Sequence, residues 1–418
     1  MRKLALALAV VLVAALGLWF VVFPAHEAPL VTSVPAAVAD GSGRTALAVT
    51  VRASLVRYIT DMQRRTGAPG VSAAAVLPDG GTVTAAVGFA DVEAGKPMTP
   101  ATLMLGGSTG KSYCAATVMT LVAAGKLDLD DKVSKFLGDR PWFARIPNSS
   151  ALTLRMLLTH TGGLPQFLDV GEFQRSFIWD AWMGRDTGYS PGTMLSFIAG
   201  QPPLSAPGAE FHYSDLGYTL LGLVVERVTG RSYYDVLRDE VLAPLGLDSI
   251  RPATSTWIPG LAVGYVASSP LNRLARMTGR NMENGVLRFN PAIEFTGGGL
   301  ANTPLGLAAF YQGLMEGRLL DAAHTSEMLE RAVPSPELGR GTHYGFGLVI
   351  VDRPGFGRYV GHSGWYPGYL SNAAWFADHG FSVAVQVNRD AAIDIYTPIR
   401  DIAALILQAM GKPRPPAS

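Results

Sequence analysis

The chain has 418 residues, of which 48% are hydrophobic and 16% are charged, a composition that excludes intrinsic disorder. Its 34 Lys+Arg and 33 Asp+Glu residues leave a formal net charge of +1 and form no run of five like charges, so we expect no nucleic-acid partner. The single cysteine, Cys114, excludes an intramolecular disulfide and a cysteine-based zinc or iron–sulfur site.

The first 30 residues predict a segment that directs the chain to a membrane. Arg2 and Lys3 precede an uncharged apolar run of twenty residues, Leu4–Phe23. As a helix this run would be about 30 Å long, enough to cross the hydrocarbon core of a bilayer. Because no small-x-small cleavage site follows directly, we expect residues 1–30 to be an uncleaved signal-anchor, with the rest of the chain exported to the periplasmic or extracellular side. A cleaved signal peptide, which would release a secreted protein, is the alternative.

A small, polar stretch at residues 31–44 is expected to be a linker to one folded domain at 45–412. Apolar residues recur at helical spacing from Thr45 to Thr66, which predicts a helix. The runs Val71–Leu77 and Thr82–Val87 are joined by Pro-Asp-Gly-Gly, which predicts a β-hairpin.

The C-terminal part is rich in β-branched and aromatic residues. Its predicted strands are Tyr344–Val351, Arg358–Val360, Leu370–Phe376 and Phe381–Val387, followed by an amphipathic helix at Ile393–Met410. The gaps between these strands are too short for crossover helices, so the strands should be antiparallel. We therefore expect an α/β fold of the α+β type. Residues 45–99 and 336–412 would form an antiparallel sheet flanked by helices, and residues 100–335 a mainly helical insertion.

The strongest chemical signal is the pair Ser108 and Lys111. They precede Ser112–Ala124, a run of almost entirely apolar or small residues that predicts a buried helix. Their spacing puts both side chains on one helix face, one turn apart. Burial lowers the pKa of a lysine and can make it a usable base. Ser108 would also lie at the helix N-terminus, where free N–H groups can bind a developing oxyanion.

The same stretch fits a second motif, Gly-x-Ser-x-Gly, formed by Gly106, Ser108 and Gly110. This is the nucleophile elbow of α/β-hydrolases and would make the chain a lipase. That alternative needs a parallel sheet, against which the closely spaced C-terminal strands argue.

Three motifs in order make the chain resemble the serine β-lactamase-related family. This family contains class C β-lactamases, D-alanyl-D-alanine carboxypeptidases, D-amino-acid amidases and esterases. The motifs are Ser108-Thr109-Gly110-Lys111 with Thr159-His160-Thr161-Gly162-Gly163-Leu164-Pro165 downstream, Tyr213-Ser214-Asp215, and Gly361-His362-Ser363-Gly364. The resemblance covers about residues 45–410 and implies a β-lactamase/penicillin-binding transpeptidase-like fold.

The resemblance also implies roles for individual residues. Ser108 would be the nucleophile, Lys111 its partner base and Tyr213 the second proton-transfer group. The substrate-binding residues would be Asp215, His362, Ser363, Gly364 and Trp365, with the backbone N–H groups of Ser108 and Trp365 as the oxyanion hole. Taken singly, each has a plainer interpretation: Tyr213 a buried tyrosine, Asp215 a helix N-cap and His362 an ordinary strand residue.

Two positions depart from the family pattern. Asp215 stands where Asn is common, and a carboxylate near Lys111 would raise the lysine pKa and shift base work to Tyr213. His362 stands where β-lactamases usually have Lys, and a neutral imidazole binds the carboxylate of a β-lactam less well. His160 belongs to a family motif, but we expect it to stabilise a turn.

The resemblance therefore implies an exported serine hydrolase that acts through an acyl-enzyme on amide or ester substrates. D-alanyl-D-alanine carboxypeptidase, D-aminopeptidase or esterase activity fits best, with weak or no β-lactamase activity. A non-turnover penicillin-binding or sensor-like protein is the alternative. We expect a small-molecule or peptide substrate, no cofactor and no metal. The aromatic stretch Phe167–Tyr189 is expected to pack in the core, with an acyl-group pocket as the alternative.

Overall fold

The structure is a computed structural model that describes residues 38–40, 45–268, 270–274, 277–391, 393–413 and 415. The expected signal-anchor at residues 1–30 and most of the expected linker lie outside these residues. Among the residues described, no helix is both long and apolar enough to cross a membrane.

Helix α2 (Ala46–Thr66) forms where the periodicity predicts it, and its ends have clear physical causes. The Thr45 Oγ1 accepts a hydrogen bond from the Ala48 N–H at 3.2 Å, which caps the first turn. Gly67 ends the helix in the left-handed conformation, at φ 63°. Its apolar stripe, including Leu55 and Ile59, is fully buried against the sheet.

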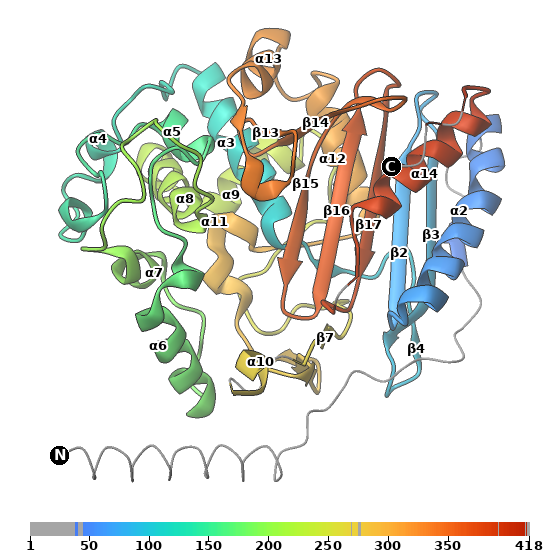
Figure 1. The fold of residues 1–418 in the computed structure, drawn as a ribbon, viewed down its shortest axis with the longest axis horizontal. Helices are drawn as coiled ribbons and strands as arrows, with labels where there is room; N and C mark the ends of the chain where they lie inside the picture. Colours follow the sequence, from blue (N-terminus) through green and yellow to red (C-terminus); the bar gives the residue numbers. More distant parts are fainter. Residues whose placement is uncertain are drawn as a thin grey trace.

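The described residues form a 10-stranded sheet in the order β1-β3-β2-β17-β16-β15-β14-β13-β12, with β4 paired to β3. The strands are β1 (Val38–Asp40), β2 (Gly70–Val76), β3 (Thr82–Asp91), β4 (Lys96–Pro97), β12 (Val333–Pro334), β13 (Thr342–Tyr344), β14 (Val349–Arg353), β15 (Gly357–Tyr366), β16 (Tyr369–Phe376) and β17 (Phe381–Val387). All of these pairings are antiparallel. Because β2 lies beside β17, both ends of the chain build one sheet (Figure 1), which confirms the expected fold and excludes the α/β-hydrolase elbow.

Three details differ from the sequence expectations. Tyr344–Val351 is not one strand, because the chain turns between β13 and β14, where the Gly345 N–H donates to the Leu348 carbonyl at 2.8 Å. The predicted strand Arg358–Val360 is too short, since β15 runs on through two glycines to Tyr366. Within the stretch expected to be a linker, β1 pairs with β3.

Two layers of helices enclose the sheet. Helices α2 and α14 (Thr397–Ala409) cover one face, and α12 (Pro304–Met315) and the mainly helical part cover the other (Figure 1). The other α-helices and strands of the described residues are α3 (Gly110–Ala123), α4 (Ser134–Leu137), α5 (Leu154–Leu158), α6 (Gly171–Trp182), α7 (Pro191–Ile198), α8 (Asp215–Thr229), α9 (Tyr233–Leu237), α10 (Pro270–Leu274), α11 (Phe295–Gly298), α13 (Ala322–Glu330), β5 (Met104–Leu105), β6 (Arg251–Pro252), β7 (Tyr265–Val266), β8 (Gly279–Arg280), β9 (Met282–Glu283), β10 (Val286–Leu287) and β11 (Leu300–Asn302). Helix α3 is buried on nearly every face, as its composition predicts, and places Lys111 inside the protein.

Candidate active site

Ser108 lies in a single 3₁₀ turn that leads directly into α3. The turn packs tightly against β15 because glycines stand on both sides of the contact. Gly107 has φ 53°, and a Cβ there would lie 2.4 Å from the Trp365 carbonyl oxygen. A Cβ on Gly364 would lie 1.8 Å from the Gly106 carbonyl oxygen. These glycines therefore allow the Ser108 backbone to lie against the strand that carries the third motif.

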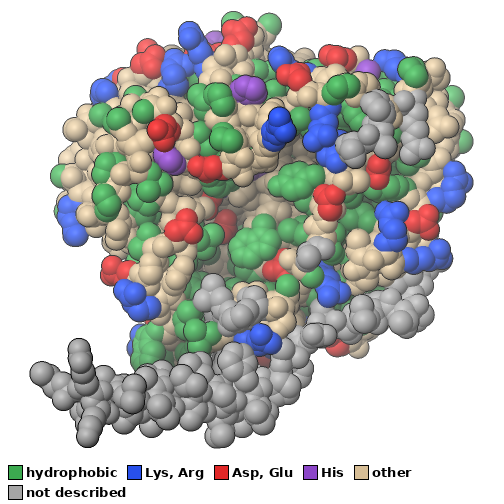
Figure 2. Space-filling model, viewed as in Figure 1, with side chains coloured by type: hydrophobic (Ala, Val, Ile, Leu, Met, Phe, Trp, Pro, Cys, Tyr) green, Lys and Arg blue, Asp and Glu red, His purple; other side chains and the backbone are tan. Residues whose placement is uncertain are grey.

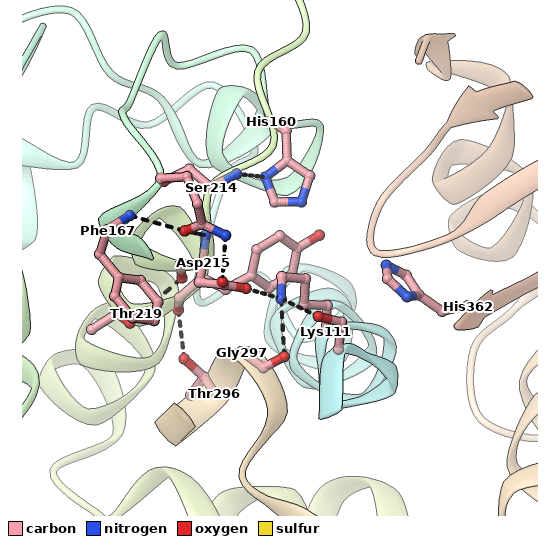
Figure 3. Close-up of polar contacts among 12 residues, drawn as sticks. Lys111, His160, Phe167, Ser214, Asp215, Thr219, Thr296, Gly297 and His362 are labelled. Carbon is pink, nitrogen blue, oxygen red and sulfur yellow. Dashed lines mark hydrogen bonds and ion pairs between the residues drawn. The ribbon is translucent and has the colours of Figure 1, made fainter. Parts of the chain in front are cut away.

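Lys111 is fully buried and its ammonium group makes three polar contacts (Figure 3). The Nζ lies 3.2 Å from the Ser108 Oγ, donates to the Gly297 carbonyl at 3.1 Å, and forms an ion pair with the Asp215 carboxylate. Burial is the largest single effect and pulls the pKa of Lys111 down, but the Asp215 carboxylate and Tyr213 together hold that pKa above its ordinary value. The resting site therefore contains an ammonium ion beside the serine hydroxyl.

Asp215 is the first residue of α8, yet the structure shows no cap formed by its side chain. The N-cap position belongs to Ser214, and the Asp215 carboxylate turns toward α3. One of its oxygens binds Lys111, and the other accepts a hydrogen bond from the Gln166 Nε2 at 2.6 Å. Gln166 is not among the residues that the motifs predict, and the only sequence signal for it is its place directly after Pro165, at the end of a family motif.

Tyr213 and His160 pack together beside Lys111. The Lys111 Nζ lies 4.9 Å from the centroid of the Tyr213 ring. Burial raises the pKa of Tyr213 to about 12, against the opposing effect of the Lys111 charge, so Tyr213 is a neutral phenol at neutral pH. His160 adopts φ 56° and accepts a hydrogen bond from the Ser214 N–H at its Nδ1 (3.1 Å). Its ring is tilted by 35° to the Tyr213 ring, with the two centroids 4.3 Å apart. His160 thus holds the turn that carries Tyr213.

His362 lies on β15, across from Lys111 (Figure 3). Its Nδ1 bonds the Ser363 carbonyl oxygen, which can only accept, so the ring proton is at Nδ1. The Nε2 then accepts from the Tyr344 hydroxyl at 3.0 Å. Burial and the Lys111 charge lower the pKa of His362 to about 4. The imidazole is therefore neutral and adds no positive charge to the site.

A cleft of about 430 Å³ opens beside these groups, and Figure 2 shows it as a hollow between the helical part and the sheet. It is lined by Ser108, Tyr213, His362, Ser363, Gly364 and Trp365, among others. The pairing of β14 with β15 ends at Val349 and Gly361, which leaves the following part of β15 with an open edge. Trp365 is 47% exposed.

The remaining expectations concern the aromatic stretch and metal ions. No residue of Phe167–Tyr189 lines the cleft in the described part of the chain. Phe173 packs edge-on against Phe167 and Phe197, with ring centroids 4.7 and 5.3 Å away, as core packing requires. Trp179 and Trp182, however, are 59% and 39% exposed, so only part of the stretch packs in the core. In the described residues, no group of three or more His, Cys, Asp or Glu side chains is arranged to hold a metal ion.

Comparisons with known proteins agree with this geometry. The family profile described as Beta-lactamase matches residues 55–407. Penicillin-binding protein 4* of Bacillus subtilis (strain 168) is 25% identical over 328 residues, covering 77% of this chain and 68% of the relative. Esterase EstB of Burkholderia gladioli is 29% identical over 333 residues, covering 74% and 82%. The crystal structure of D-amino acid amidase from Ochrobactrum anthropi SV3, complexed with L-phenylalanine amide, superimposes with a TM-score of 0.69 at 26% identity, covering 88% of this chain and 99% of the amidase. The chain belongs to the Beta-lactamase family and is a serine hydrolase with that family's fold.

Proposed function

We propose that the chain hydrolyses esters or amides of the D-amino-acid type through an acyl-enzyme formed on Ser108. The observation that carries this proposal is the 3.2 Å contact between the Lys111 Nζ and the Ser108 Oγ, at the mouth of a cleft. Similarity to an esterase and to a D-amino acid amidase supports both substrate classes. The activity would be that of a D-alanyl-D-alanine carboxypeptidase, a D-aminopeptidase or an esterase.

Lys111 is the candidate acceptor for the proton of Ser108. Loss of the ammonium proton to water in the cleft, which the Asp215 carboxylate opposes, gives a neutral amine. The amine accepts the Ser108 proton as the Oγ attacks the substrate carbonyl carbon. Tyr213 donates its phenolic proton to the leaving amine or alkoxide and regains one from Lys111. Water then repeats these steps on the acyl-enzyme and releases the product acid.

The tight contact of the Ser108 turn with β15 supports an oxyanion hole formed by the N–H groups of Ser108 and Trp365. The neutral His362 argues for weak β-lactamase activity, because it offers no permanent charge to the carboxylate of a β-lactam.

Kinetics with p-nitrophenyl acetate, a D-Ala-D-Ala peptide and nitrocefin test this function. We expect repeated turnover of the ester or the peptide, and Ser108→Ala should abolish both turnover and labelling by a fluorophosphonate. Lys111→Ala should lower kcat/KM by several orders of magnitude. Ser176→Ala, on α6 and outside the cleft lining, is the matched control. A covalent adduct on another serine would refute the assignment, and a single turnover would identify a stalled penicillin-binding protein instead.

We further propose that residues 1–30 anchor the enzyme to a membrane, with the hydrolase part outside the cytoplasm. The apolar run Leu4–Phe23, which directly follows two basic residues, supports this proposal. Cell fractionation should place the full chain with the membranes, and external protease should reach the hydrolase part. Recovery of the full chain in the cytosol would refute the anchor.

A further inference from the structure

The cleft does not end at Ser108 but continues over the outer face of the sheet, the face covered by α14. In the β14–β15 ladder, Val349 lies opposite Gly361, and Val351 lies opposite Tyr359. Ala374 on β16 lies opposite Gly361 on the other side. All five residues line the cleft.

The segment before α14 and the helix itself form the other wall. Three apolar side chains line the cleft from this side: Ile393, Ile395 and Ile399. The Tyr396 hydroxyl lies 3.1 Å from the Ser363 Oγ and so ties this wall to β15 close to the catalytic end. The result is an apolar groove that begins at Ser108. We call this extension the outer groove.

The charged residues of the outer groove are all of one sign. Its lining includes Arg340, Arg353 and Arg400 and no Asp or Glu. Within the described part of the chain, neither Arg340 nor Arg353 forms an ion pair with a carboxylate. Figure 2 shows Lys and Arg side chains gathered above the hollow and hydrophobic ones along its rim.

The strand register gives the length of the outer groove. Arg353 lies opposite Gly357, six residues along β15 from Ser363. At about 3.3 Å per residue, the cationic end lies about 20 Å from the catalytic end. An extended hydrocarbon chain spans such a distance.

From this arrangement we propose that the outer groove binds the acyl part of an amphiphilic, anionic substrate. The reacting carbonyl carbon lies at Ser108, an apolar chain lies over Val351 and Tyr359, and an anionic end group lies at Arg353 and Arg340. The acyl part stays attached to Ser108 through both half-reactions. In the first, the bond from the Ser108 Oγ to the carbonyl carbon forms and the bond to the leaving group breaks. In the second, water displaces the Ser108 Oγ, which regains its proton.

This proposal rests on the proposed acyl-transfer function and adds the substrate class. Apolar burial favours a long chain at about 0.8 kcal/mol per methylene when fully buried, and a charge-assisted hydrogen bond to an arginine favours an anionic end. A short ester without a charge would gain neither the apolar burial nor the hydrogen bond to an arginine.

Three p-nitrophenyl esters test the proposal: the acetate, the palmitate and the mono-ester of hexadecanedioic acid, which carries a free carboxylate at its far end. We expect kcat/KM to rise by about tenfold or more from acetate to palmitate. Val351→Asp should lower the palmitate-to-acetate ratio of kcat/KM by about tenfold. Arg353→Ala should lower the hexadecanedioate-to-palmitate ratio by about fivefold.

Two matched controls should keep the wild-type ratios. Val49→Asp places the same charge on α2 at a residue that is 58% exposed. Arg358→Ala removes an arginine from the same hairpin that pairs with Asp352 instead of lining the groove. If Val351→Asp does not fold, Val351→Trp fills the groove without adding charge and should lower the same ratio.

Unchanged ratios in folded Val351 and Arg353 variants would overturn the outer groove as the acyl site. Such a result would leave the proposed function intact, because the acetate reports catalysis by Ser108 alone. A wild-type protein that turns over none of the three esters, and whose Ser108 takes no fluorophosphonate label, would instead refute the proposed function and this proposal with it.

Discussion

At the scale of the single residue, Asp215 decides the charge of the catalytic lysine. Burial alone would lower the pKa of Lys111, and the Asp215 carboxylate reverses that effect together with Tyr213. Asp215→Asn keeps a side chain that can accept from Lys111 but removes the negative charge. The pKa of Lys111 should then fall, because burial still lowers it and the Asp215 charge no longer opposes that effect.

The acidic limb of the kcat/KM profile, which reports the free enzyme, should therefore move to lower pH in Asp215→Asn. The measurement is a pH–rate profile with one ester for both proteins. A Gln166→Ala variant removes the hydrogen bond from Gln166 to Asp215 without changing any charge. The acidic limb of its pH–rate profile should therefore stay closer to that of the wild type. Coincident limbs for wild type and Asp215→Asn would refute the coupling.

His362 leads to a prediction about acid stability. Its pKa is about 4 in the folded protein and about 6.5 in an unfolded chain, so protons favour the unfolded state. The stability contributed by neutral His362 is complete above pH 6.5 and is lost as the pH falls toward 4. By proton linkage, about 2 kcal/mol of the free energy of unfolding should disappear between about pH 7 and about pH 5.

In His362→Gln this part of the pH dependence should be absent, although the variant is less stable at neutral pH. Urea unfolding at both pH values measures it. Burial also lowers the pKa of His160, so some pH dependence of the free energy of unfolding should remain in the variant. Equal losses of stability in wild type and variant would contradict the role of His362.

The motifs predict which residues form the candidate site, but they do not predict several of the side chains that those residues contact. Ser108 and Lys111 are three residues apart, so helical geometry alone brings them together. The contact of Asp215 with Gln166 spans 49 positions, and that of His362 with Tyr344 spans 18. Such contacts depend on how loops and strands pack, which local spacing does not encode. For the same reason, the sequence leaves two orientations of the Asp215 side chain open: one that caps the following helix and one that contacts Lys111.

At the scale of the element, β15 joins the sheet to the catalytic turn. Gly361 and Gly364 weaken strand propensity, so the sequence alone predicts a strand that ends at Val360. The structure shows why small residues are needed: a Cβ on Gly361 would lie 1.9 Å from the Ala373 carbonyl oxygen, and one on Gly364 would meet Gly106. Close backbone approach, and not the end of the strand, is the reason for these glycines.

Gly364→Ala should therefore separate β15 from the Ser108 turn. Overpacking of this kind costs about 1–3 kcal/mol of stability. Displacement of an oxyanion-hole donor should lower kcat by about 100-fold or more. Gly192→Ala on α7 is the matched control, since the nearest atom to its added Cβ is 3.9 Å away, and it should retain activity. Thermal unfolding and ester kinetics measure both effects, and a fully active Gly364→Ala would contradict the proposed contact.

At the scale of the whole molecule, the sheet depends on both ends of the chain. Strand β17 pairs with β2 on one side and with β16 on the other, so segments more than 300 positions apart are central neighbours. The apolar core on the outer face is likewise shared between α2 and α14. The hydrolase part should for this reason unfold in one cooperative transition.

Two truncations test this dependence in opposite directions. Among the described residues, the first core residue is Ala48, and β1 begins at Val38. A fragment of residues 31–418 should therefore fold, with the Tm and the kcat/KM of the full chain. A fragment of residues 1–396 lacks α14 and its buried residues Ile399, Ile402, Ile406 and Leu407.

Burial of each of those four side chains contributes about 1.5–3 kcal/mol. Together they match the whole net stability of a typical domain, about 5–15 kcal/mol, so the fragment without α14 should not fold. Size-exclusion chromatography, thermal unfolding and ester turnover distinguish the two fragments. A folded, active fragment of residues 1–396 would show that the helical part and the remaining sheet are stable without α14. An insoluble fragment of residues 31–418 would show that residues 1–30 belong to the fold and are not a separate anchor.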